Sequence, residues 1–238
     1  LKNMEILFLN LQLERSLKKM LLNLIKKELL IEFRSKQIIL SMLIFGLAII
    51  LIFALSSNVS SEILSSYSPG MFWLMNLFIV VLGVHRSFAY EKEFDAFSLL
   101  VSAPINRGQI FLSKWISGFI FITITQLIVI VPFFNLLLLD IPENLLLFIL
   151  TSMLINLGMM AIANLVSGIV IRSNFSEILL PLLMFPLLSP LIIAATKISS
   201  AVINAHSYEV WNVWVLIVVS IVVLFGLAGY ALFDFIVE

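Results

Sequence analysis

Hydrophobic residues run through this chain in long stretches rather than in the short periodic stripes of a soluble fold. A window of about 20 residues, which as a helix crosses the hydrocarbon core of a bilayer, finds six such stretches. They cover residues 38–55, 70–89, 115–139, 144–171, 178–196 and 210–233. The pattern predicts an all-α polytopic membrane protein whose six transmembrane helices form one domain over 38–238.

The polar segments between these spans differ in charge. Residues 56–69 and 140–143 carry no Lys or Arg. Of the 14 Lys and Arg residues, every one except Lys197 lies before the first span, in the last turn of the second span or in the loop after it, or after the fourth span. Because short basic loops stay on the cytoplasmic side, we expect both termini in the cytoplasm.

The N-terminal segment is amphipathic. Between residues 21 and 36 the apolar positions recur every three or four residues, with the basic residues off this stripe. The stripe is Leu22, Ile25, Leu29 and Phe33. Such a pattern predicts a helix in the membrane interface, in a segment 21–37. Residues 1–20, which open with Leu1 and end at Met20, are interpreted as an upstream extension of the reading frame or a disordered segment.

Composition narrows the class of protein further. The chain is 62% hydrophobic and 12% charged, which excludes an ordinary soluble enzyme. Its formal net charge is zero, so no basic excess favours nucleic acid. Because it contains no cysteine, disulfides and thiolate metal sites are ruled out.

One cytoplasmic segment, 91–114, is too long for a simple turn. It opens with Glu91, Glu93 and Asp95, breaks at Pro104 and resumes at Asn106. We expect a short helix, a turn and a second helix that enters the third span.

Prolines and glycines also mark positions within the spans. The fifth span contains Pro181, Pro186 and Pro190, which predicts a kinked or broken helix. Four glycines in the later spans are expected at close helix contacts rather than at a chemical site. They are Gly158, Gly168, Gly226 and Gly229.

Candidate catalytic chemistry is sparse. Polar residues at membrane depth are explained by hydrogen bonds between helices; they are Asn76, Thr123, Thr125, Gln126, Asn135, Asn156 and Asn164. The segment Gly108–Lys114 lacks the second glycine of a phosphate-binding loop. His85 and His206 fall on opposite sides of the membrane and cannot share a metal. We therefore expect no catalytic residue, no metal and no nucleotide on this chain.

Residues around the second span form a specific combination. They are Ser68-Pro69-Gly70-Met71-Phe72-Trp73 and Leu82-Gly83-Val84-His85-Arg86-Ser87-Phe88-Ala89-Tyr90-Glu91-Lys92-Glu93. With the charged lead-in 30–36, the loop residues 99–105, Arg107 and Lys114, and the proline-rich stretch 179–192, they resemble the CcmB family, the membrane subunit of the cytochrome c maturation ABC transporter. The resemblance covers about residues 22–234.

This resemblance implies an ABC-2-like exporter permease in the bacterial inner membrane. It implies a homodimer that works with a CcmA-type ATPase and alongside CcmC, CcmD and the haem chaperone CcmE. ATP would be hydrolysed on the partner subunit and haem handled by the complex, so that no cofactor is bound directly. Hydrolysis would drive haem delivery, or release of haem-loaded CcmE from CcmC.

A chain that is driven by ATP on another subunit must receive force through a cytoplasmic element. We hypothesise that Glu91, Glu93 and Asp95 dock or orient the segment 91–107, and that Pro104 fixes its turn. Asn106 and Arg107, where the second helix begins, belong to the same hypothesis. The alternative is that the acidic residues face water or pair with Lys92.

Two other functions remain open at the level of sequence. One is an ABC-2 permease for another cargo, such as a lipid, glycan or drug, because that class shares the six spans and the cytoplasmic segment. The other is a membrane scaffold without transport.

Overall fold

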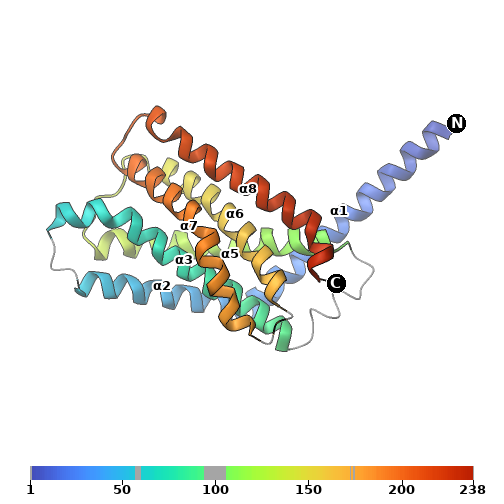
Figure 1. The fold of residues 1–238 in the computed structure, drawn as a ribbon, viewed down its shortest axis with the longest axis horizontal. Coiled ribbons are helices and arrows are strands. Elements are labelled where there is room, and N and C mark those ends of the chain that lie inside the picture. The colour runs from blue at the N-terminus through green and yellow to red at the C-terminus, as the bar shows by residue number, and fades with distance from the viewer. Residues whose placement is uncertain (1, 57–59, 94–105, 172, 174, 238) are drawn as a thin grey trace.

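The described part of the chain is helical and contains no strand. The computed structural model describes residues 2–56, 60–93, 106–171, 173 and 175–237, and their side chains except those of 2–18, 61, 90–93 and 237. Figure 1 shows the helices packed side by side, with one helix leaving the bundle. Their bounds are α1 Lys2–Ser35, α2 Gln37–Ser56, α3 Ser61–Glu93, α5 Arg107–Leu136, α6 Leu145–Val170, α7 Ser176–Ile203 and α8 Tyr208–Val237.

Six of these helices, α2, α3 and α5 to α8, are long and apolar enough to cross a membrane. This confirms the predicted all-α polytopic fold. The helices extend beyond the apolar windows at several ends. For example, α5 begins at Arg107, in the segment that precedes the expected span, because polar residues continue the helix where hydropathy has already fallen.

The bundle is built around α6, which contacts α3, α5, α7 and α8. At the end of the bundle away from α1, aromatic rings from three helices form a buried cluster. The Phe72 ring lies 5.1 Å from that of Phe133 and 5.5 Å from that of Phe148. Rings at these distances attract through their quadrupoles as well as by burial. The cluster therefore holds α3, α5 and α6 together at that end.

Glycines let α8 approach α5 closely. A Cβ at Gly226 would lie 2.6 Å from the Trp115 ring, and one at Gly229 would overlap the Phe111 ring. A Cβ at Gly168 would similarly meet Phe233, and one at Gly158 would meet Leu191. The predicted close contacts at these four glycines are thus confirmed.

The proline-rich helix α7 is continuous from Ser176 to Ile203, so it is not broken. Each proline lacks the N–H that would bond to the carbonyl four residues earlier. For Pro190 that carbonyl belongs to Pro186, and the Ser189 hydroxyl donates to it at 2.8 Å. A side chain thus supplies the hydrogen bond that the backbone cannot.

The long helix α1 extends out of the bundle at its N-terminal end and contacts α5 and α2 nearer its C-terminus (Figure 1). It ends at Ser35, and the next residue, Lys36, has a φ of 54° that turns the chain into α2. The face that it buries includes Leu24 and Glu32, whereas Leu22 and Phe33 of the predicted apolar stripe are 55% and 57% exposed. The other two residues of the stripe, Ile25 and Leu29, are half-buried. The stripe is therefore only partly packed on the bundle, and its two exposed positions are open to lipid.

Candidate functional site

The structure describes part of the segment expected to receive force from an ATPase. Glu91 and Glu93 lie in the last turn of α3, with their side chains outside the description. Asp95 and Pro104 fall outside the described residues altogether. Of the six residues in that hypothesis, only Asn106 and Arg107 can be placed in full.

Asn106 and Arg107 fix the start of α5. The Asn106 side-chain oxygen accepts a hydrogen bond from the Gly108 N–H at 2.8 Å and so caps the helix. The Arg107 guanidinium donates to the Asp234 carbonyl at 3.1 Å, and its Nε lies 3.9 Å from the Asp234 carboxylate. The beginning of α5 is thereby tied to the end of α8.

The segment that partly resembles a phosphate-binding loop is the beginning of this same helix. Gly108 packs so closely on α8 that a Cβ there would lie 2.7 Å from the Tyr230 carbonyl oxygen. Lys114 is 4% exposed and faces α1. Residues 108–114 therefore form a helical packing surface rather than a phosphate cradle.

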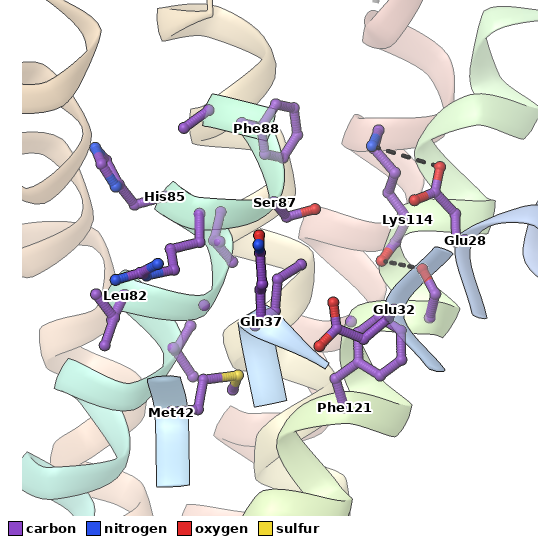
Figure 2. Close-up of a pocket in the computed structure, with 18 of the residues that line it drawn as sticks. Glu28, Glu32, Gln37, Met42, Leu82, His85, Ser87, Phe88, Lys114 and Phe121 are labelled. Atoms are coloured by element: carbon purple, nitrogen blue, oxygen red, sulfur yellow. Dashed lines mark hydrogen bonds and ion pairs between the residues drawn. The ribbon is translucent and has the colours of Figure 1, made fainter. Parts of the chain in front are cut away.

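Lys114 forms a buried ion pair at the junction of α1 and α5. Its Nζ lies 3.6 Å from the Glu28 carboxylate and 4.9 Å from the centre of the Phe88 ring (Figure 2). Lys27 lies 3.0 Å from the same carboxylate. Burial raises the pKa of Glu28, but Lys114 and Lys27 lower it, and the net shift is downward. Glu28 thus stays ionised and holds α1 against α5.

One turn further along α1, the Glu32 side chain is 1% exposed, and only one of its two carboxylate oxygens has a hydrogen-bond partner. Oε1 accepts a hydrogen bond from the Ile39 N–H at 2.8 Å, which caps the first turn of α2. Oε2 is buried without a hydrogen-bond partner. Burial raises the pKa of Glu32, the Ile39 and Ile38 N–H groups lower it, and the net shift is upward.

Between these helices lies a cavity of about 420 Å³. The α1–α2 corner, the end of α3 and the start of α5 enclose it, and Asn164 of α6 also lines it. Figure 2 shows Gln37 and Ser87 projecting into the space, with Glu32 and Lys114 on the opposite wall. The described cationic side chains other than Lys197 lie at this end of the bundle, which we call the basic end.

Buried polar residues in the middle of the bundle are neutral. The Asn156 amide of α6 donates to the Gln126 side-chain oxygen of α5 at 2.7 Å, which confirms the expected interhelical bond for this pair. Asn76, Thr125 and Asn164 instead donate to carbonyls four residues earlier in their own helices. A short polar side chain reaches that carbonyl as easily as it reaches a neighbouring helix.

The candidate metal ligands are scattered in the described part of the chain. No three His, Cys, Asp or Glu side chains there are arranged to hold a metal ion. His85 lines the cavity, whereas His206 lies between α7 and α8 at the other end of the bundle.

The sequence reasoning missed the Glu28–Lys114 pair and the buried carboxylate of Glu32. One signal was available: Glu28 and Glu32 are four residues apart, so they share a face of α1. The face that carries Glu28 and Glu32 is acidic rather than apolar, and the protein packs it against the bundle.

The sequence of the chain matches the model of one protein family. The model of the CcmB protein family matches residues 19–234, which is most of the chain. No curated protein matches the chain in sequence. The six span-capable helices lie within the matched range except for the last residues of α8, and α1 lies within it from Lys19 onward. The chain therefore belongs to the CcmB family, and it is a multi-pass membrane subunit of a haem-exporter ABC transporter.

Proposed function

We propose that this chain couples ATP hydrolysis by a CcmA-type ATPase to haem delivery, or to release of the haem-loaded chaperone CcmE from CcmC. The family match over residues 19–234 is the observation that carries the proposal. The helical conformation of residues 108–114 supports the assignment of ATP to the partner subunit. Haem is handled by the complex, and this chain holds no cofactor of its own.

The coupling element is the segment between α3 and α5, around Glu91, Glu93, Asp95 and Pro104. Two observations support this choice. The segment joins helices at the basic end, and it leads into the cap formed by Asn106. Since Arg107 ties α5 to α8 through Asp234, a displacement of the segment would move both helices together.

The assembly that we propose contains two copies of this chain, a CcmA-type ATPase, CcmC, CcmD and CcmE. It lies in the bacterial inner membrane with both termini in the cytoplasm. The charge distribution supports this orientation, since basic side chains gather at one end of the bundle and Lys197 alone among the described ones lies toward the other.

The test begins with the chain purified from its native membrane through a C-terminal tag in mild detergent. Mass spectrometry then identifies the proteins that accompany it. We expect an ATPase together with CcmC-like and CcmD-like proteins. An ATPase alone would favour an ABC-2 permease for another cargo, and the absence of any ATPase would favour a scaffold.

The coupling residues are tested by reversing the three acidic charges, with Glu91, Glu93 and Asp95 each changed to Lys. We expect the ATPase to be lost from the purified complex while circular dichroism shows unchanged helix content. Asp140→Lys and Glu143→Lys, in the connection between α5 and α6 at the other end, form the control and should retain the ATPase. Full assembly of the triple variant would refute the assigned role.

A further inference from the structure

The cavity at the basic end is lined by both apolar and polar side chains. The apolar ones include Met42, Val84, Phe88, Phe121 and Met160. The polar ones include Glu32, Gln37, Ser87 and Arg86. Its volume of about 420 Å³ falls within the range of roughly 300–1,000 Å³ that is usual for small-molecule sites. Such a lining suits a ligand with a polar head and an apolar body.

The charged side chains that line the cavity indicate which polar headgroup the ligand would carry. Glu28 and Lys114 neutralise each other at 3.6 Å. Glu32 retains a buried oxygen with no hydrogen-bond partner. Arg86 is exposed, and no ion pair to it is found within the described residues. Apart from the Glu28–Lys114 pair, the charged groups of the lining that can meet a ligand are the Glu32 carboxylate of α1 and the Arg86 guanidinium of α3.

A buried carboxylate oxygen without a partner is costly, and a cationic N–H donor would stabilise it strongly. A guanidinium is well suited to a phosphate group. A molecule that carries an ammonium and a phosphate on an apolar body therefore complements the cavity at both charged positions. Phospholipids with a primary amine have this chemistry.

The depth of the cavity agrees with such a ligand. It lies where α2 begins at Gln37 and where α5 enters its apolar stretch after Lys114, which is the level of lipid headgroups rather than of the hydrocarbon centre. Next to it, α2 exposes Leu40 and Ile44, which are 55% and 60% accessible. Acyl chains too long for the cavity would have an apolar surface to follow.

We propose that this cavity binds an aminophospholipid, with the ammonium group on Glu32, the phosphate toward Arg86 and the start of an acyl chain against Met42 and Phe121. A choline headgroup has no N–H to donate, so it leaves the Glu32 oxygen unpaired. A glycerol headgroup carries no cation. The site therefore discriminates between lipids by the headgroup amine, independently of ATP or haem.

The test uses the full chain in lipid nanodiscs that contain equal amounts of phosphatidylethanolamine, phosphatidylcholine and phosphatidylglycerol with identical acyl chains. The protein is extracted, and the lipids that it retains are counted by native mass spectrometry. We expect roughly tenfold enrichment of phosphatidylethanolamine over phosphatidylcholine, since a hydrogen bond to a charged group is worth that factor or more. Equal retention of the three lipids would overturn the proposal.

The variant Glu32→Gln keeps an oxygen for the Ile39 N–H but removes the charge. We expect it to abolish the preference for the primary amine. Glu143→Gln, at an exposed position at the other end of the bundle, is the matched control and should keep the preference. Unchanged enrichment in Glu32→Gln would place the lipid elsewhere.

A second variant tests occupancy of the cavity without touching the carboxylate. Ser87 projects into the space in Figure 2 and is only half-buried, so a larger side chain can be accommodated there. Ser87→Trp should fill the cavity and remove the enriched lipid while helix content is unchanged. Retention of phosphatidylethanolamine by this variant would also refute the assignment.

Discussion

The middle of the bundle and its basic end both bury polar side chains, but they bury different kinds. In the middle, the Asn156 amide pairs with the Gln126 side chain. Toward the other end, the Trp73 indole donates to the Ser199 hydroxyl at 2.7 Å. At the basic end, the buried pair is an ion pair, Glu28 with Lys114. The same degree of burial thus holds neutral groups in one region and charged groups in the other.

The cost of a charge explains the difference. An ionised side chain at the centre of a bilayer costs at least about 2.5–3.5 kcal/mol, whereas a neutral amide needs only a partner. Near the headgroups, water and other charges are close enough to offset this cost. The type of buried polar contact therefore follows its depth in the membrane. Neutral hydrogen bonds join helices within the hydrocarbon core, and ion pairs join helices near the headgroups.

The largest effect is expected from Lys114→Met. The variant leaves Glu28 buried with only Lys27 near it, and the loss of one partner of a buried ion pair lowers stability by about 3 kcal/mol. Reversible unfolding in mixed micelles at pH 7 measures this loss. The double variant Glu28→Gln with Lys114→Met is the control and should regain most of it. If the double variant is no more stable than Lys114→Met alone, the pair does not hold the junction.

A smaller effect is expected from Gln126→Leu in the middle of the bundle. Hydrogen bonds between membrane helices contribute about 0.6 kcal/mol on average, so the loss should be about 1 kcal/mol or less. A double-mutant cycle with Asn156→Leu, followed by the same unfolding measurement, isolates the pair. A coupling energy as large as that of Glu28 and Lys114 would contradict the difference between the two regions.

The smallest change, at Glu32, has a distinctive dependence on pH. Because the folded pKa of Glu32 is raised above 4.5, its unfavourable contribution is absent below pH 4.5 and grows as the pH rises through the folded pKa. Glu32→Gln should therefore be more stable than the parent at pH 7 and equal to it in acid. Thermal unfolding across this range measures the difference.

Glu28 supplies the opposite control for that measurement. Its folded pKa is lowered below 4.5, so its favourable contribution is present above pH 4.5 and is lost as the pH falls through the folded pKa. Glu28→Gln should be less stable than the parent at pH 7, and the difference should vanish in acid. If the stability of both variants relative to the parent changed in the same direction with pH, the pKa values of Glu28 and Glu32 would not be shifted in opposite directions.

The sequence predicts the six helices of the bundle because a helix that crosses the hydrocarbon core needs about 20 apolar residues, and a hydropathy window of that length detects them. The start of α5 at Arg107 confirms the second helix that was expected after Pro104 and that enters the third span. A hydropathy window alone would place this start later, because polar residues such as Gln109 and Lys114 lower its mean hydropathy. Helix ends are set by caps such as Asn106, which lie outside the apolar window.

The candidate site was harder to predict than the fold. An apolar stripe normally marks the buried face of a helix, but on α1 Leu22 and Phe33 are exposed and Glu32 is buried. The remaining stripe residues, Ile25 and Leu29, are only half-buried. The partner of Glu28 lies on a helix far along the chain, and no local pattern in a single sequence links the two. The pairing of charges therefore required the tertiary structure.

The prolines of α7 have a mechanical consequence. Bending a helix normally stretches its ladder of backbone hydrogen bonds, but Pro181, Pro186 and Pro190 have already removed three rungs from this one. Ser189 restores a single bond at Pro186, and a hydroxyl can rotate to keep it as the axis tilts. The helices α3 and α5 each contain one internal proline and the neighbouring α6 contains none, so α7, with three, is the helix that can bend at the lowest enthalpic cost.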